Sequence, residues 1–195
     1  MCYRKRLTLF LPFLALVLFG ASCAWVPQSA ELNVSPTFLP SAQGRGLTVA
    51  VEVLDRRMTT TIGHRGVDSQ NAKITTKQNL PLLFRDALIA GLGQKGFHAI
   101  PHAGEPGLVL TVEVRKIDYS TDMDFWKGIV MTEAVLDAST VKNGIRFAQV
   151  YTGRRKENTI EAPGAKTNNR LLSEAMTEAT HSLIEDPHLL RFLAE

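Results

Sequence analysis

The clearest feature of the chain is an alternation of apolar and polar residues in two stretches. Apolar side chains occupy every second position at 47–53 and again at 108–115. A period of two is typical of β-strands with one buried face, so both stretches are predicted to be strands. Shorter strands are expected at 31–35, 72–76 and 97–100, between residues that favour turns.

Two further strands, at 127–140 and 145–156, are predicted to form a hairpin. Asn143 and Gly144 lie between them. Both central residues of a type I′ turn need a positive φ, which asparagine and glycine adopt most readily. The two strands are therefore expected to be antiparallel neighbours.

Apolar residues spaced three and four apart predict two amphipathic helices. The first follows Asn79, a good capping residue, and stops near Gly96. The second covers 171–184, with the asparagines at 168–169 as candidate caps. The Asp-Pro pair at 186–187 predicts a short terminal helix, with Asp186 as its cap and Pro187 in its first turn.

These elements predict an α+β fold. Its expected form is a two-layer sandwich, with a mostly antiparallel sheet and two amphipathic helices on one face. Residues 31–195 are expected to form a single domain, because a chain of this length builds one core comfortably and two only poorly.

The first 22 residues have the pattern of a bacterial lipoprotein signal. Basic residues at 4–6 precede an apolar run at 7–19, and small residues at 20–22 precede Cys23. The apolar run is shorter than the roughly 20 residues that a membrane-spanning helix needs. Residues 1–22 are therefore interpreted as a removable signal peptide.

Cys23 is predicted to carry the lipid, and residues 23–30 to form a tether. Gly20 stands where such signals usually have leucine, so the alternative is an ordinary secretory signal that leaves Cys23 as a free thiol. Ala24 follows the cysteine, which favours sorting to the outer membrane, facing the periplasm. Apart from this covalent lipid, no cofactor is predicted.

Charge gives no reason to expect a nucleic-acid partner. The chain has 22 lysines and arginines against 19 acidic residues, and loss of the three cations at 4–6 makes the two numbers equal. A mature chain of zero formal charge has no electrostatic preference for nucleic acid or for an anionic membrane surface.

Motifs of catalysis and metal binding are missing from the sequence. It contains no G-x-S-x-G, Walker-type or H-E-x-x-H pattern, so no catalytic residue is predicted and an enzyme is not expected. His98 and His102 are too isolated to indicate a metal site. Asp118, Asp122 and Asp124 are interpreted as a solvated turn.

Two segments are candidate binding sites. The loop from Asp55 to Gly66 contains Arg57 and Arg65, whose guanidinium groups could bind a carboxylate or phosphate; the alternative is that Asp55 pairs with them and orders the loop. Residues 125–126, Phe125 and Trp126, form either an aromatic patch for a partner protein or a covered edge of the core.

The order of several short motifs resembles the YajG-type lipoprotein family of Gram-negative bacteria. These are Leu-Asn-Val-Ser-Pro at 32–36, Asp-Arg-Arg at 55–57, Gly-Phe at 96–97, the strand at 108–119 and the terminal helix pair. The resemblance implies an envelope lipoprotein and its fold, and hardly any mechanism. A weaker similarity is to small α+β modules of envelope assembly lipoproteins and the amino-terminal domain of TolB.

The function expected from the sequence is that of a non-enzymatic, protein-binding lipoprotein. Its membrane contact would be the lipid anchor and its partner another envelope protein. One alternative is a binder of cell-wall glycans or small anions that uses the Asp55 to Gly66 loop. A more distant one is an enzyme that acts on wall fragments with Asp122 and Asp124.

Overall fold

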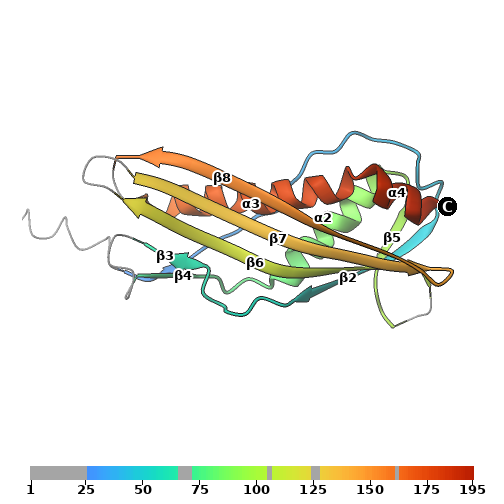
Figure 1. The fold of residues 1–195 in the computed structure, drawn as a ribbon, viewed down its shortest axis with the longest axis horizontal. Helices are drawn as coiled ribbons and strands as arrows, with labels where there is room; N and C mark the ends of the chain where they lie inside the picture. The colour runs from blue at the N-terminus through green and yellow to red at the C-terminus, as the bar shows by residue number, and fades with distance from the viewer. Residues whose placement is uncertain (1–25, 66–71, 105–106, 124–127, 161–162) are drawn as a thin grey trace, which may run out of the picture.

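The computed structural model describes residues 26–65, 72–104, 107–123, 128–160 and 163–195. The strands in these residues are β1 (Gln28–Ser29), β2 (Thr48–Asp55), β3 (Gly63–His64), β4 (Lys73–Thr75), β5 (His98–Pro101), β6 (Val109–Met123), β7 (Gly128–Lys142) and β8 (Ile145–Thr159). The helices are α2 (Leu80–Gln94), α3 (Ala165–Ile184) and α4 (Pro187–Ala194). All eight strands belong to one sheet (Figure 1).

Strand β6 lies inside the sheet and pairs with other strands along both of its edges. One of its edges pairs with β7 in antiparallel fashion along the whole strand. The other edge is shared, because β2 pairs in parallel with residues 109–114 and β3 pairs in parallel at Tyr119. Of the seven pairings in the described residues, four are parallel. The prediction of a mostly antiparallel sheet is wrong: the sheet is mixed.

The parallel pairing of β2 with β5 follows from the route of the chain after β2. It passes through β3, β4 and α2 before it reaches β5, which pairs in parallel with β2. A connection of this length lets a strand enter the sheet in the same direction as its neighbour, which a tight turn does not allow. The sequence showed the helix between the strands, but its role as a crossover was not recognised.

The hairpin of β7 and β8 is confirmed. The two strands pair in antiparallel register from Lys142 with Ile145 onward. Asn143 has a φ of 52° and Gly144 a φ of 78°, as the type I′ turn requires.

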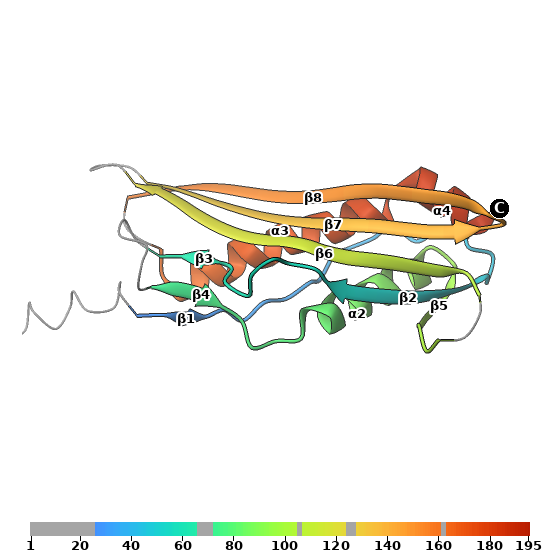
Figure 2. The ribbon, with the colours of Figure 1, turned by 60° about the horizontal axis from the view of Figure 1, so that its bottom comes forward.

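The helices all lie on one face of the sheet (Figure 1). Alternate residues of β7 point to this face and are buried, from Val130 to Thr140. The other face is left uncovered by the described helices (Figure 2). None of these helices is long and apolar enough to cross a lipid bilayer.

Two of the predicted helix caps are confirmed and one is wrong. The Asn79 side chain accepts a hydrogen bond from the N–H of Leu82, and the Asp186 side chain accepts one from the N–H of His188. Helix α3 begins earlier than predicted, after Gly164, so Asn168 lies inside the helix. Asn168 is fully buried, and its amide bonds to β1 and β6 instead of capping the helix.

The predicted strand at 31–35 is wrong as well. Its backbone bonds to side chains and not to the sheet: the N–H of Leu32 donates to Gln78 at 2.6 Å, and the N–H of Asn33 donates to Ser173 Oγ of α3 at 3.0 Å. Strand β1 lies just before it and pairs with β4. Residues 28–30, predicted as part of the tether, are thus incorporated in the domain, where the Ala30 side chain is buried.

The domain is long, and its two ends differ. One end, here called the N-terminal end, holds β1, β3, β4 and the start of β7 (Figure 2). The opposite end, here called the hairpin end, holds the turn between β7 and β8 together with α4. At about 3.3 Å per residue, the 15 residues of β7 separate the two ends by about 50 Å.

Candidate functional site

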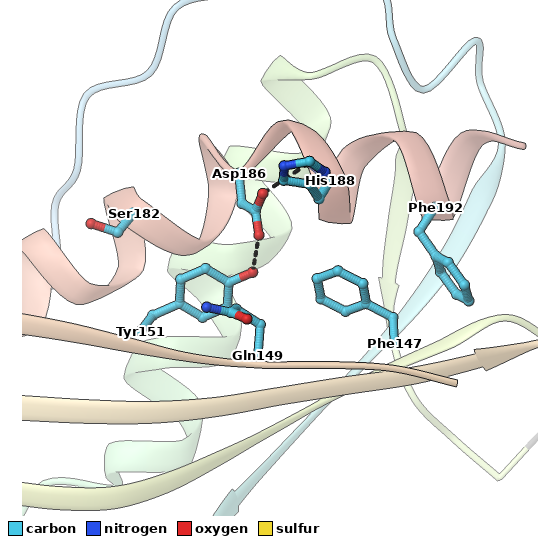
Figure 3. Close-up of a pocket in the computed structure, with 7 residues that line it drawn as sticks. All are labelled: Phe147, Gln149, Tyr151, Ser182, Asp186, His188 and Phe192. Atoms are coloured by element: carbon cyan, nitrogen blue, oxygen red, sulfur yellow. Dashed lines mark hydrogen bonds between the residues drawn. The ribbon is translucent and has the colours of Figure 1, made fainter. Parts of the chain in front are cut away.

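An open groove lies at the hairpin end, between β8 and α4. Its volume is about 610 Å³. Strand β8 supplies its floor, and the junction of α3 and α4 supplies the facing wall (Figure 3). The lining residues are Phe147, Gln149, Tyr151, Ser182, Asp186, His188 and Phe192. We call this the distal groove.

Asp186 connects the floor of the distal groove to its wall. One carboxylate oxygen accepts the backbone N–H of His188 at 2.8 Å and so caps α4. The other accepts the hydroxyl of Tyr151 on β8 at 2.5 Å (Figure 3). Burial, reinforced by this carboxylate, raises the pKa of Tyr151 well above its usual value, so the hydroxyl remains a hydrogen-bond donor.

Although the groove contains a serine, a histidine and an aspartate, they are not arranged as a catalytic relay. Asp186 bonds the backbone of His188 and not its imidazole. The hydroxyl of Ser182 points away from the His188 ring (Figure 3). A nucleophile and its base must lie within hydrogen-bond reach of each other, which these three side chains do not show.

The groove has an apolar rim. The rings of Phe147 and Phe192 lie with their centroids 5.7 Å apart, tilted by 40°. Beside them, the tip of the hairpin exposes Ile145 by 65% and Val141 by 57%. Apolar side chains exposed together next to a groove are typical of a protein-binding surface.

Two cations beside the hairpin turn lack an ion-pair partner. Within the described part of the chain, no carboxylate forms an ion pair with Lys142 or Arg146. Lys142 instead donates to the carbonyl oxygen of Leu193 at 3.0 Å. The tip of the hairpin therefore combines apolar surface with two cations that have no ion-pair partner in the described residues.

The uncovered face of the sheet is different, because its charges neutralise one another. Glu133 on β7 accepts hydrogen bonds from Lys116 at 2.8 Å and from Arg154 at 2.7 Å. The bond from Lys116 is the main cause of a lowered pKa for Glu133, although partial burial opposes it. A face of satisfied pairs attracts a charged partner less strongly than the hairpin end does.

The predicted binding loop after β2 is held by a local ion pair. The Arg57 guanidinium donates to both oxygens of Asp55, at 2.9 and 2.8 Å, and this pairing lowers the pKa of Asp55 against the opposing effect of burial. Arg65 donates to the carbonyl oxygen of Pro163 at 3.3 Å. These bonds give the two arginines different partners, which corresponds to the local-pairing alternative for Arg57. A binding role for the loop stays a prediction.

The other predicted site residues lie outside the described part of the chain: Cys23, Phe125 and Trp126. His98 and His102 lie at β5 and directly after it. Among the residues that the structure describes, no group of three or more histidine, cysteine, aspartate or glutamate side chains is placed to hold a metal ion.

Sequence reasoning missed the distal groove, though it saw its parts. Phe147 and Tyr151 belong to a strand that was predicted, and Asp186 was predicted to cap the last helix. No local pattern indicated that this strand and this helix lie side by side. The sequence predicted the short terminal helix and the hairpin separately, and their contact forms the groove.

The comparisons with known proteins give a family and a fold. Residues 36–194 match a family model described as "Uncharacterized lipoprotein". No curated protein matches the chain. The crystal structure of protein XCC0632 from Xanthomonas campestris, described by family model DUF330, aligns with a TM-score of 0.54 and 11% identity, over 85% of this chain and 94% of that one. At this identity the likeness shows a shared fold alone.

Two other crystal structures align with lower scores. A neuraminyllactose-binding hemagglutinin homolog from Helicobacter pylori has a TM-score of 0.44 and 12% identity, over 85% of this chain and 97% of that one. Lipoprotein GNA1162 from Neisseria meningitidis has a TM-score of 0.33 and 13% identity, over 57% of this chain and 84% of that one.

Proposed function

Since the chain belongs to the family of uncharacterised lipoproteins matched over residues 36–194, we propose that it is a lipid-anchored binding protein whose hairpin end docks an envelope protein. The anchor is the acylated thiol of Cys23, in the periplasmic leaflet of the outer membrane, where Ala24 favours sorting. Membership of the YajG-type group of such lipoproteins is part of the same proposal.

The observation that carries this proposal is the position of the distal groove relative to the first strand. From Cys23 to Gln28 an extended chain spans at most about 18 Å, so β1 stays near the bilayer. The groove and the unpaired cations lie at the far end of strands about 50 Å long. In the proposed orientation the strands rise from the bilayer, so that the surface suited to binding projects into the periplasm.

Several acyl chains on one sulfur make such an anchor durable. Each buried methylene contributes about 0.8 kcal/mol, and more than one chain exceeds the marginal binding of a single chain. The protein would keep its hairpin end at a constant height above the membrane, within reach of periplasmic or membrane-bound partners. A non-enzymatic role is included in the proposal, because Asp186 uses its two oxygens for hydrogen bonds to Tyr151 and to the backbone of His188.

The proposal is tested by crosslinking in intact cells from two positions. A photoreactive benzoylphenylalanine replaces Ile145 at the hairpin end in one variant and Ile160, after β8 at the N-terminal end, in the other; both side chains are strongly exposed. A discrete adduct with one envelope protein is expected from position 145 and not from position 160. Equal adducts from both positions, or none from position 145, would refute it.

The anchor is tested separately with labelled palmitate. The native chain is expected to incorporate the label and to remain with membranes in high salt. The Cys23→Ser variant is expected to do neither. A native chain that takes up no label would refute the anchor but would leave the crosslinking result to be judged by itself.

A further inference from the structure

Strand β8 is a free edge of the sheet. It pairs with β7 along its 15 residues and, in the described part of the chain, with no other strand. An edge strand exposes a row of backbone N–H and C=O groups that can pair with another strand. Proteins commonly bury or charge such edges, so the accessible part of β8 is of interest.

Hydrogen bonding shows which groups of β8 point outward. The N–H of Arg154 donates to the Glu178 carboxylate of α3 at 2.9 Å, so it points away from β7. In an antiparallel pair the inward and outward groups alternate along the strand. The N–H groups of Thr152, Val150 and Ala148 therefore point outward as well, and so does that of Arg146.

Only the first half of this edge is open. In the second half, Glu178 bonds to the backbone of Arg154 and to the side chain of Arg155. Helix α3 also approaches β8 closely at Gly153, where an added Cβ would lie 2.0 Å from the carbonyl oxygen of Ala175. Before this point Ala148 and Val150 are exposed, the latter by 54%.

The open half of the edge runs along the distal groove. Phe147, Gln149 and Tyr151 line the groove, and the residues between them face the uncovered side of the sheet. Side chains of an added strand would alternate in the same way. Every second side chain would enter the groove beside Phe147, and the others would lie beside Arg146.

Charge distinguishes the possible occupants. Strand β8 carries four cations, at 146 and 154–156, and a single anion, Glu157. A second copy paired through the open half would bring no carboxylate to Arg146, because residues 146–152 contain no acidic residue. A strand with carboxylates on the Arg146 side would instead meet a cation that has no ion-pair partner in the described structure.

We infer that the partner binds by adding one acidic β-strand to the open edge of β8 between Arg146 and Thr152. Its alternate apolar side chains fill the distal groove, and its carboxylates face Arg146. Backbone hydrogen bonds supply affinity, and the groove supplies selectivity. This inference rests on the proposed function, for which it names the chemistry of the partner.

The test uses the full processed chain in detergent and a synthetic peptide in which glutamate alternates with phenylalanine and valine. Binding is measured by fluorescence anisotropy, and protection of backbone amides by hydrogen exchange. The peptide is expected to bind and to protect the amides of Ala148 and Val150. The same peptide with lysine in place of glutamate is expected not to bind.

Two substitutions at one position separate strand addition from side-chain contact. Ala148→Pro removes an outward N–H and keeps the ladder to β7, because the lost donor does not serve β7. It is expected to weaken peptide binding roughly tenfold or more, which corresponds to about 1.4 kcal/mol. Ala148→Thr retains the N–H and is expected to bind like the native chain.

Several results would overturn the inference. These are equal binding by Ala148→Pro and the native chain, peptide binding without protection at Ala148 and Val150, or a dimer of the chain that Ala148→Pro dissociates. Because hydrogen exchange is measured on the native chain, it tests strand addition even if the Ala148→Pro variant unfolds. If the crosslink from position 145 survives in Ala148→Pro cells, strand addition fails while the proposed function stands; if the native chain gives no crosslink there, the proposed function fails.

Discussion

Replacing Lys95 with methionine is expected to destabilise the domain strongly. Lys95 caps the end of α2, and only 4% of its side chain is exposed. Its ammonium group donates to both carboxylate oxygens of Glu185 at 2.7 Å and to the carbonyl oxygen of Leu39 at 2.8 Å. One side chain therefore links the end of α2 to the end of α3 and to the segment that contains Leu39.

The magnitude follows from what the substitution leaves behind. Breaking a buried ion pair by removing one partner costs about 3–5 kcal/mol, mainly because the other charge stays buried. Glu185 keeps 29% of its side chain exposed and regains some hydration, so the expected loss is about 2–3 kcal/mol. Lys116→Met is the matched control: its ammonium also binds a carboxylate at 2.8 Å, but its side chain is 49% exposed, and the expected loss is about 0–1 kcal/mol.

Urea unfolding at neutral pH compares the free energies of unfolding of the two variants in a Cys23→Ser background without lipid. The pH dependence is a second check. The hydrogen bond from Lys95 is the main cause of the lowered pKa of Glu185, whose usual value is 4.5. Its ionised carboxylate stabilises the fold above that pH, and the stabilisation is lost as the pH falls through the lower folded-state pKa.

The difference in free energy of unfolding between the native chain and Lys95→Met is therefore expected to become smaller in acid. A Lys95→Met variant that loses no more stability than Lys116→Met would refute the reasoning. So would a difference that stays constant from neutral pH to well below 4.5.

Two further predictions concern packing and a buried network. Gly153→Ala is expected to cost about 2–3 kcal/mol, because the new Cβ would lie 2.0 Å from the carbonyl oxygen of Ala175, whereas Gly93→Ala, with nothing within 4 Å, is expected to stabilise α2 by about 0.5–1 kcal/mol. Equal urea midpoints for the two alanine variants would contradict this. Asn168→Ala is expected to cost about 2–3 kcal/mol, because it leaves buried polar partners in β1 and β6 without their bonds. Faster hydrogen exchange at the N–H of Ala30, which donates to β4, is the local readout, and an unchanged rate would count against the network.

Much of the secondary structure was readable because its causes are local. Alternation at 48–55 and 109–115 reflects strands with one buried face. The turn at Asn143 and Gly144 depends on their own backbone preferences, so the antiparallel hairpin followed from two residues. Asn79 caps α2 with a side chain three residues away from its donor. In each case the interactions that cause the structure lie between residues a few positions apart.

The candidate site was not readable for the opposite reason. The bond between Tyr151 and Asp186 joins residues 35 positions apart, and the contact between Phe147 and Phe192 joins residues still farther apart. The parallel pairings of β6 with β2 and with β3 also join segments that are far apart in the sequence. The predicted caps at 168–169 failed because Asn168 serves a buried network, which no local preference announces.

By itself the sequence determined the long strands, the helices, the caps of α2 and α4, the hairpin turn and the signal pattern that ends at Cys23, because each depends on neighbouring residues. Only the tertiary structure decided that the sheet is mixed, that Gly153 lies under α3, and that β8 and α4 enclose a groove beside an open strand edge. These features depend on which distant segments become neighbours. That choice is made by the summed burial of the whole core, and no short stretch of sequence contains it.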